Sequence, residues 1–412
     1  MVNNKYKWPL NTINHSWLDR LILAFFFLNK KNRWSIGDRV EKFEKDFAQF
    51  LGVKYVVLTS SGSTANSILS HNHKDTNIDE FNKGRKQVIL NGITWATNIN
   101  PWIRDGFEPV FIDINLKDFC IDYGLLENYL DKNCKRVSCL FITNLIGYGG
   151  DINNLERISK KYNIPLYFDN CESSLSYYYE YENMCFVNIG QKFTHTHSFF
   201  IGHLINGLEL GCIATNDEIE YQKFLLYRNH GLIRCIKDLD NVNHKLYEEL
   251  QNSLVDDSFS FALVGNNYRP TELNTLIAQL DFSRVGDYIK TRQYLFQLYS
   301  DNLNRVKFLL PSEDDFYVKN THFCLPIIIN PKYNYNKIAM IDKAKKYCDS
   351  NLIERRPIIS STMTRQLIYQ KYGDYKKLKN SEFITKYGFY VGLSYSTKER
   401  DILDLTKFLN NI

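Results

Sequence analysis

Short apolar runs alternate with helical patterns through the first half of the chain. Runs rich in β-branched and aromatic residues occupy positions 53–58, 88–90, 109–113, 139–143 and 164–169, and helices or longer connections separate them. Alternation of this kind specifies a mostly parallel sheet that helices cover on both faces. Parallel strands end at one edge of their sheet, and α/β proteins bind ligands there. The sequence therefore predicts an α/β fold in which functional residues follow the strands.

The composition narrows the class of protein. With 412 residues, 44% of them apolar, and a net charge of +5, we expect a globular protein with a large core. Lysine and arginine are spread along the chain, which gives no support for a nucleic-acid partner. Nine cysteines are scattered without a CxxC pair and without a secretory signal before them. We therefore expect a cytoplasmic protein with reduced thiols and no iron–sulfur cluster or other metal site.

Three helical patterns lie outside the alternating strands. The apolar run at 21–28 is far shorter than the roughly 20 residues that a membrane-spanning helix needs. We expect a buried helix face there and no membrane partner. A second pattern predicts a helix that ends at Gly52, and a third, over 272–298, predicts one long helix that leads out of the large domain.

A turn of small residues follows the first predicted strand. Residues 60–66 read SSGSTAN and lead into a helix. Backbone N–H groups gather at such a turn, where hydrogen bonds and the helix dipole bind phosphate. Ser63 and Thr64 are the candidate ligands. From the residues alone, a plain capping turn explains the segment equally well.

Later strands also end in candidate residues. Trp95 follows the strand at 88–90, although a tryptophan is often only a core anchor. Asp169 ends a nearly continuous apolar strand, where it could also cap a helix, and Glu172 follows it. An apolar run from Ser198 ends in His203. An imidazole carries protons but, unlike a lysine amine, forms no stable covalent link to an aldehyde. Taken alone, His203 could be a satisfied polar residue at a strand end.

Together these motifs resemble the DegT/DnrJ/StrS sugar-aminotransferase-like family of fold-type-I pyridoxal phosphate (PLP) enzymes. The resemblance runs from about Trp8 to the C-terminus and rests on SSGSTAN, on FDNCE around Asp169, and on RRPI and TRQ near the C-terminal end. His203 stands where the family carries the lysine that holds the cofactor. That exchange marks the branch of PLP- or pyridoxamine phosphate (PMP)-dependent sugar 3-dehydratases, such as the GDP-4-keto-6-deoxymannose 3-dehydratases.

The resemblance implies a role for each candidate residue. The cofactor would be held by Ser63, Thr64 and Ser198 at its phosphate, by Trp95 and Asp169 at its ring, and by Glu172. In the segment GNNYRPT, Asn267 would complete the partner's site in a homodimer, while Arg269 and Arg356 would bind the anionic substrate. The implied organisation is an N-terminal helical segment (1–37), a large cofactor-binding α/β domain (38–300) and a small C-terminal α+β domain (301–412).

The implied reaction is 3-deoxygenation of a nucleotide-linked 4-keto-6-deoxy sugar, for which we expect GDP as the nucleotide. Glutamate would supply the amine. An ordinary imidazole has a pKa of about 6.5, so His203 would be available in both protonation states at neutral pH. It would remove a proton at the cofactor and protonate the departing C3 hydroxyl.

Two other functions fit less well. An aminotransferase with a relocated lysine would need Lys192, but Lys192 precedes the apolar run instead of following it. A non-catalytic relative could bind a nucleotide sugar or a partner subunit, although the retained cofactor residues argue against that. The identity of the sugar stays open, because the chain departs from the pattern of the branch at Leu204, Leu210 and Leu393.

Overall fold

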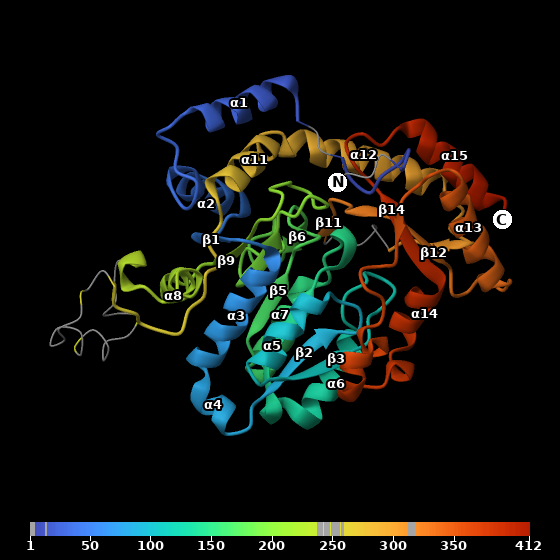
Figure 1. Ribbon diagram of the computed structural model, residues 1–412. Helices are drawn as coiled ribbons and strands as arrows, with labels where there is room; N and C mark the ends of the chain where they lie inside the picture. Colours follow the sequence, from blue (N-terminus) through green and yellow to red (C-terminus); the bar gives the residue numbers. More distant parts are fainter. Residues whose placement is uncertain are drawn as a thin grey trace.

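A computed structural model describes residues 5–12, 15–236, 259–311 and 318–412, together with positions 242, 248 and 256. Three β-sheets organise this part of the chain. The largest lies at the centre, and the C-terminal elements pack beside it around a four-stranded sheet (Figure 1). A short three-stranded sheet consists of β11 (Val318–Lys319), β6 (Tyr177–Glu180) and β7 (Cys185–Asn188).

The central sheet confirms the predicted α/β fold. Its strands, in spatial order, are β1 (Tyr55–Thr59), β9 (Gly211–Thr215), β8 (His195–Ser198), β5 (Leu166–Asp169), β4 (Val137–Thr143), β2 (Gln87–Asn91) and β3 (Glu108–Ile112). Among these seven strands, β9 alone runs antiparallel to its neighbours. The other six therefore end at the same edge of the sheet.

Helices cover both faces of this sheet (Figure 1). Leu90 and Phe141 face α3 (Gly62–Thr76), α5 (Asn100–Arg104) and α8 (Glu218–Arg228), with the short α4 (Ile78–Asn82) beside them. Ile89 and Leu140 face α6 (Tyr123–Asn133) and α7 (Ile152–Tyr162). Consecutive residues of a strand point to opposite faces. Both faces are buried, which explains why the strands are continuous apolar runs.

Two helices lead to the C-terminal part, α11 (Glu272–Phe282) and α12 (Val285–Asn302). The prediction of one helix over 272–298 is wrong: α11 stops at Ser283, whose hydroxyl donates to the carbonyl of Leu280 (2.7 Å). The antiparallel four-stranded sheet contains β10 (Phe308–Leu309), β12 (Cys324–Ile329), β14 (Gly388–Gly392) and β13 (Arg355–Arg356). The helices of this part are α13 (Lys337–Ser350), α14 (Lys379–Tyr387) and α15 (Glu399–Asn410).

The N-terminal helices are α1 (Trp17–Leu28) and α2 (Asp38–Leu51), and α2 ends at Gly52 as predicted. The expectation of a buried face at 21–28 is wrong. Within α1 only Asp19 and Phe26 are buried, because the helix lies on the outside of the molecule and touches α11 along one narrow side (Figure 1). Arg284 Nη1 donates to Asp19 Oδ2 there (2.6 Å). No helix within the described ranges is long and apolar enough to cross a membrane.

Candidate active site

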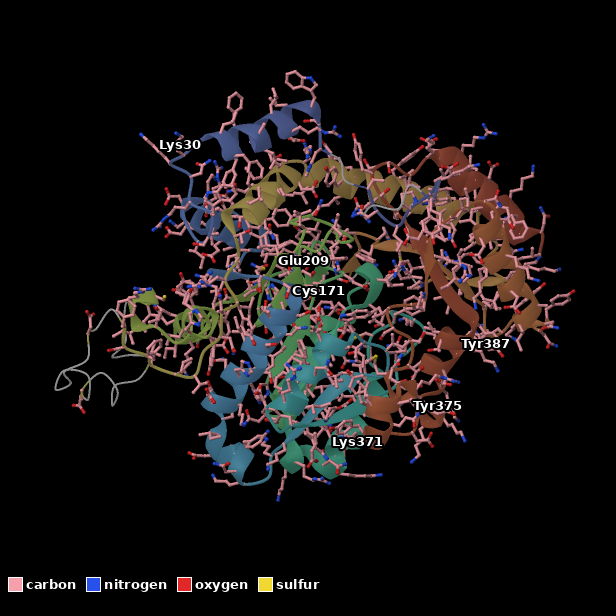
Figure 2. All side chains as sticks on the ribbon, in the orientation of Figure 1. Lys30, Cys171, Glu209, Lys371, Tyr375 and Tyr387 are labelled. Atoms are coloured by element: carbon pink, nitrogen blue, oxygen red, sulfur yellow. The ribbon has the colours of Figure 1, made fainter. Side chains whose placement is uncertain are left out.

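The edge at which the parallel strands end brings most candidate residues together. β1 leads into the turn before α3, β5 ends at Asp169, and β8 ends at Ser198. Trp95 follows β2 at the same edge. Cys171, two residues after Asp169, lies in the middle of the molecule (Figure 2). The site is therefore built from loops that the sheet holds in fixed positions.

The turn before α3 presents free backbone donors. Ser61 caps the helix: its hydroxyl accepts from the Thr64 N–H (3.2 Å), and the Thr64 hydroxyl accepts from the Ser61 N–H (3.0 Å). The N–H groups of Gly62 and Ser63 have no hydrogen-bond partner among the described residues. These two donors can bind an anion at the positive end of the helix dipole.

Ser198 lies against this turn. A Cβ atom at Gly62 would lie 2.8 Å from the Cβ of Ser198 and 3.0 Å from the Sγ of Cys171. A Cβ atom at Gly211, the first residue of β9, would lie 2.2 Å from the Gly62 nitrogen. The two glycines thus let the turn approach β8 and β9, so the Ser198 side chain sits beside the start of α3.

Asp169 is buried and fixed in orientation. Its Oδ2 accepts from the Asn66 amide (3.1 Å), and its Oδ1 accepts from the Cys171 N–H (2.8 Å). Asn66 also donates to Asn98 Oδ1 (3.0 Å) and accepts from the Thr196 hydroxyl (2.6 Å). The carboxylate therefore cannot rotate without breaking a buried network. It suits a cationic ring nitrogen, which would add a charge-assisted hydrogen bond.

Trp95 is unusual because 53% of it is exposed although it follows a buried strand. The adjacent Thr94 is buried, and its hydroxyl lies 2.7 Å from that of Thr143. The backbone is thus fixed while the indole stays accessible. An accessible indole at the ligand-binding edge suits stacking on a planar ring.

Burial changes the acid–base properties of His203. Its ring packs against those of Phe200 and Phe323, with centroids 5.9 and 5.5 Å away, and no described residue bonds its buried Nδ1. Burial lowers the pKa of His203 to about 4. The expectation that both protonation states are available at neutral pH is therefore wrong for the chain alone, because the apolar surroundings keep the imidazole neutral.

Glu172 is shifted in the opposite direction. Its Oε2 accepts from the Ile146 N–H (2.8 Å). Burial nevertheless raises the pKa of Glu172 to about 7, and the charge of Asp169 contributes to the increase. The loops at this edge therefore contain a neutral imidazole and also a carboxyl group that changes charge near neutral pH.

The four-stranded sheet adds an aromatic wall. Tyr390 of β14 lies 6.2 Å from Phe323 between ring centroids, and the Phe323 N–H donates to the Ile146 carbonyl (3.2 Å). Burial raises the pKa of Tyr390, and the charge of Glu172 adds to the increase. Arg356 pairs with Tyr390 in the register of β13 and β14, and its exposed guanidinium reaches Glu354 (3.1 Å). Arg356 is thus at the rim, beside the wall.

The segment with Asn267 and Arg269 approaches the turn before α3 of its own chain. The carbonyl of Tyr268, which lies between them, accepts from the Ser60 N–H (2.8 Å). Asn267 is exposed and Arg269 is partly buried. Both side chains can therefore be placed near an anion-binding turn, either in this chain or across a contact between two copies.

Lys192 lies at the wrong end of β8 for a relocated cofactor lysine. It precedes the strand, whereas Ser198 ends it. Its ammonium group is paired with Glu180, with Glu182 (3.0 Å) and with Glu156 (3.7 Å). These pairs outweigh burial and raise the pKa of Lys192 above its ordinary value. A charged and fully paired lysine on that side cannot reach the strand ends.

Several residues that complete the site are not predicted by the local sequence motifs. Asn66 orients Asp169, Phe323 and Tyr390 form the aromatic wall, and Asn11 donates to the carbonyl of Ile201 (2.6 Å) in the loop before His203. Asn66 closes the SSGSTAN motif, so its position after the turn is a usable signal. The other three carry none, because they come from distant parts of the chain.

The fold and this edge define an aspartate-aminotransferase-like PLP enzyme of fold type I. The chain belongs to the DegT/DnrJ/EryC1/StrS aminotransferase family, whose model matches residues 23–409. It is 26% identical to the GDP-4-keto-6-deoxy-D-mannose 3-dehydratase of Yersinia pseudotuberculosis, over 96% of either chain. A solved E. coli GDP-4-keto-6-deoxy-D-mannose-3-dehydratase with bound hydrated PLP is 25% identical, with a TM-score of 0.83 over 98% of this chain and 99% of that one. The Helicobacter pylori aminotransferase PseC shares the fold at 19% identity, with a TM-score of 0.79 over 98% of either chain.

Proposed function

We propose that the chain is a PLP/PMP-dependent 3-dehydratase that deoxygenates C3 of a nucleotide-linked 4-keto-6-deoxy sugar. The observation that carries the proposal is the position of His203. It lies in the loop that follows β8, where the resemblance places the lysine of an aminotransferase, while Lys192 is held by carboxylates at the other end of the strand. The chain thus has the surroundings of the cofactor without the amine that would tether it.

The residues at the strand ends fit PLP or PMP. The free N–H groups of Gly62 and Ser63, with the Ser198 side chain beside them, suit the phosphate. Asp169 suits the ring nitrogen, and the exposed indole of Trp95 suits the ring face. Thr64 acts through the helix cap, since its hydroxyl already donates to the Ser61 carbonyl (2.8 Å). When bound, the cofactor supplies an electron sink next to the sugar carbon that loses its hydroxyl.

His203 moves the proton. A neutral imidazole has a free lone pair, so with cofactor and sugar bound His203 would accept a proton and then donate it to the C3 oxygen, which leaves as water. The rings of Phe200 and Phe323 cover part of the imidazole, which limits proton exchange with solvent during the transfer. Glu172, with its pKa of about 7, can hold a proton at the same edge as a carboxylic acid.

The substrate is expected to be GDP-linked, with glutamate as the amine donor. A solved GDP-4-keto-6-deoxymannose-3-dehydratase contains GDP-perosamine, and another contains PLP and glutamate trapped together. Arg269 and Arg356 are the candidate anchors for the anionic groups, because a guanidinium can form paired hydrogen bonds to phosphate or carboxylate. A cytoplasmic location would supply both glutamate and nucleotide sugar.

The reaction is tested by incubating the protein with PLP, glutamate and GDP-4-keto-6-deoxymannose and weighing the product. A sugar lighter by one oxygen, with release of ammonia, is expected. His203→Asn should lose turnover by about 10²–10⁴-fold while the cofactor spectrum persists, because only the proton carrier is removed. His203→Lys should hold PLP covalently, which borohydride reduction and mass spectrometry detect. An amino sugar that retains its C3 hydroxyl would establish the aminotransferase instead.

We also infer a homodimer in which Asn267 completes the site of the partner. The support is the exposure of Asn267 beside the anion-binding turn, together with the prevalence of two-fold dimers. Mixing Asn267→Ala chains with His203→Ala chains should restore part of the activity, since one intact site can form in a mixed dimer. If subunit exchange is demonstrated without any recovery, the site is not shared.

A further inference from the structure

The outer face of α1 is a row of exposed apolar side chains. Trp17 is 72% exposed, Phe25 66% and Leu28 74%, and Leu18 and Leu21 belong to the same row. Spacings of four, four and three along residues 17, 21, 25 and 28 place the row on one side of the helix. Opposite that side, Phe26 and Asp19 contact the protein. The row is therefore not an unpacked core face but a second apolar face.

The net charge of the protein lies in the same segment. Residues 1–37 contain six of the 51 lysines and arginines and one of the 46 acidic residues, so their net charge equals the +5 of the whole chain, and residues 38–412 are balanced. The single acid, Asp19, is already neutralised by Arg284 (2.6 Å). Four of the cations, Arg20, Lys30, Lys31 and Arg33, lie on α1 or directly after it. Lys30 marks this end of the helix in Figure 2.

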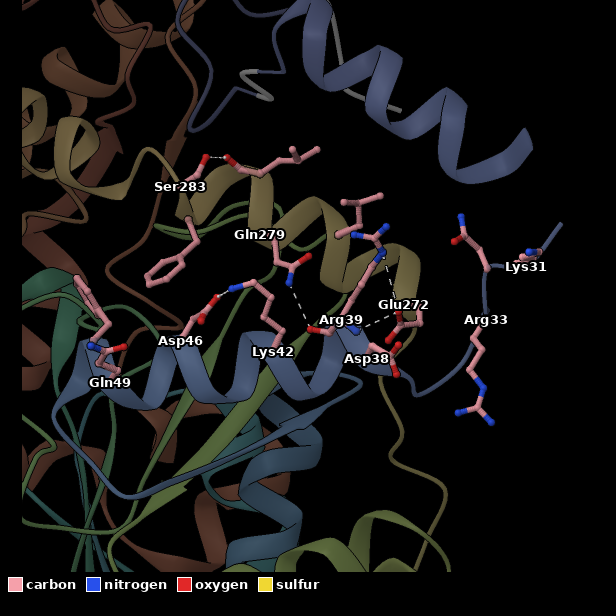
Figure 3. A pocket seen from close by; sticks show the side chains of 15 residues that line it. Lys31, Arg33, Asp38, Arg39, Lys42, Asp46, Gln49, Glu272, Gln279 and Ser283 are labelled. Carbon is pink, nitrogen blue, oxygen red and sulfur yellow. Dashed lines mark hydrogen bonds and ion pairs between the residues drawn. The ribbon is translucent and has the colours of Figure 1, made fainter. Parts of the chain in front are cut away.

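A cleft of about 1120 Å³ between α2 and α11 lies below these cations. Figure 3 shows Lys31 and Arg33 at its mouth, while Arg39 and Lys42 deeper inside are paired with Glu272 (4.0 Å) and Asp46 (2.6 Å). No ion pair with another described residue uses Lys31 or Arg33. The cations next to α1 are thus free to meet an external anionic surface.

Contrary to the expectation of no membrane partner, we propose that α1 docks this protein on an anionic lipid surface. An amphipathic helix with large apolar side chains on one side and lysine or arginine at its border lies in the plane of a bilayer interface, with the apolar side at the acyl boundary. Each basic residue near the surface adds attraction to anionic headgroups. The helix is about 18 Å long at 1.5 Å per residue, enough to lie on the surface but not to cross it.

A second copy of the chain is a poorer occupant of this face. Two α1 helices packed face to face would bring their basic borders together, and the one acid in each segment is already paired. A membrane of anionic lipid complements the apolar row and the charge at once. The two alternatives can be told apart by their dependence on lipid. Contact with a second copy forms in the absence of lipid, whereas membrane binding requires it.

The test is sedimentation of the full chain with phosphatidylcholine vesicles that contain or lack phosphatidylglycerol. We expect binding to the anionic vesicles and a fall in binding as salt is raised. Replacing Trp17 and Phe25 together by Ser should lower the partition coefficient roughly 100-fold. The matched control is Leu367→Ser with Ile368→Ser, two side chains that are 84% and 67% exposed in the C-terminal part. This control should bind as the wild type does.

Charge is tested separately. Lys30→Glu with Lys31→Glu should weaken binding to anionic vesicles roughly tenfold or more, whereas Lys376→Glu with Lys377→Glu, an exposed pair far along the chain, should have little effect. Circular dichroism and turnover verify that each variant is folded. Equal sedimentation of wild type and the α1 variants, or loss of an oligomer in lipid-free light scattering when Trp17 and Phe25 are replaced, would overturn the proposal, the latter in favour of a second copy.

Discussion

The strand-end site and the outer face of α1 depart from the usual distribution of residues in opposite ways. At the strand ends polar groups are buried: Asn66 is 1% exposed, Asp169 4%, and each has partners within hydrogen-bond distance. On α1 large apolar groups are exposed, and Phe25 and Leu28 contact no core. Buried polar groups and exposed apolar patches are the two informative exceptions in a folded protein. Here each exception marks a different kind of binding.

The two regions differ in what their side chains contact: the polar groups around Asp169 are bonded within the chain, whereas the apolar side chains on the outer face of α1 are not covered by it. The polar network around Asp169 is made within the chain, so it fixes the orientation of the carboxylate that would meet a ligand atom. The apolar row of α1 has no partner in the chain, so it is completed by a broad surface with little geometric demand. The strand-end site therefore satisfies its polar groups within the chain, whereas the docking face of α1 leaves its apolar groups to be covered from outside.

The largest expected effect is at the buried network. Asn66→Ala should lower the free energy of unfolding by about 3–5 kcal/mol, because it leaves Asp169, Asn98 and Thr196 with unsatisfied polar atoms. Urea unfolding measures this. Ser67→Ala on the same helix removes only a bond to the Ser63 carbonyl (3.1 Å) and should cost about 1 kcal/mol or less. If Asn66→Ala matches Ser67→Ala, the network does not hold the site.

The sequence predicts the fold well for a physical reason. Strands buried on both faces must be continuous apolar runs, so β4 and β5 stand out without any knowledge of their partners. The hairpin of β6 and β7 gives no such signal, because the side chains of β6 alternate between partly buried and buried and those of β7 lie mostly at the surface. Turn signals also locate the start of α3 and the end of α2.

The site is predictable only where its chemistry is local. Asp169 and Ser198 follow directly from their positions at strand ends. The bond between Asn66 and Asp169 joins residues 103 positions apart. Burial lowers the pKa of His203, and its ring packs against Phe323, which lies just before β12 in a distant part of the chain. The prediction that α1 is buried fails for the same reason. An apolar run predicts that its side chains contact some apolar surface, but it does not identify that surface.

The second prediction concerns Glu172, a partly buried acid. Folding raises the pKa of Glu172 from 4.5 to about 7, so its contribution to stability is complete below pH 4.5 and is lost as pH rises through 7. Glu172→Gln never ionises. Relative to wild type it should therefore gain up to about 3 kcal/mol between pH 4.5 and pH 8, measured from urea unfolding across that range.

Glu127 supplies a control of opposite sign. Arg157 and Lys161 bind its carboxylate and lower the pKa of Glu127 to about 2. Its stabilising effect is present above pH 4.5 and is lost as pH falls toward 2. As pH rises from 2 to 4.5, Glu127→Gln should thus lose stability relative to wild type and then stay level, whereas Glu172→Gln gains stability between pH 4.5 and pH 8. The same pH trend in both variants would show that Glu172 is not held in a buried environment.

The smallest effect is expected at Phe25, on the outer face of α1, and its buried neighbour Phe26 provides the comparison. Phe26 is 2% exposed and packs on Trp34, with ring centroids 5.5 Å apart, whereas Phe25 is 66% exposed. Phe26→Ala should cost about 3–5 kcal/mol, since it opens a cavity beneath the helix. Phe25→Ala should change the unfolding free energy by no more than about 0.5 kcal/mol, because the side chain is already in water and alanine favours the helix.

Urea unfolding of both variants at two protein concentrations, without lipid, shows whether another copy of the chain covers the outer face of α1. A small and concentration-independent effect of Phe25→Ala means that the outer face of α1 is uncovered in solution and free for a membrane. A cost near that of Phe26→Ala, growing with protein concentration, means that another copy of the chain already covers Phe25, since binding of a partner stabilises the folded state by mass action. In that case the contrast between the two regions disappears, because both would be buried in the assembled protein.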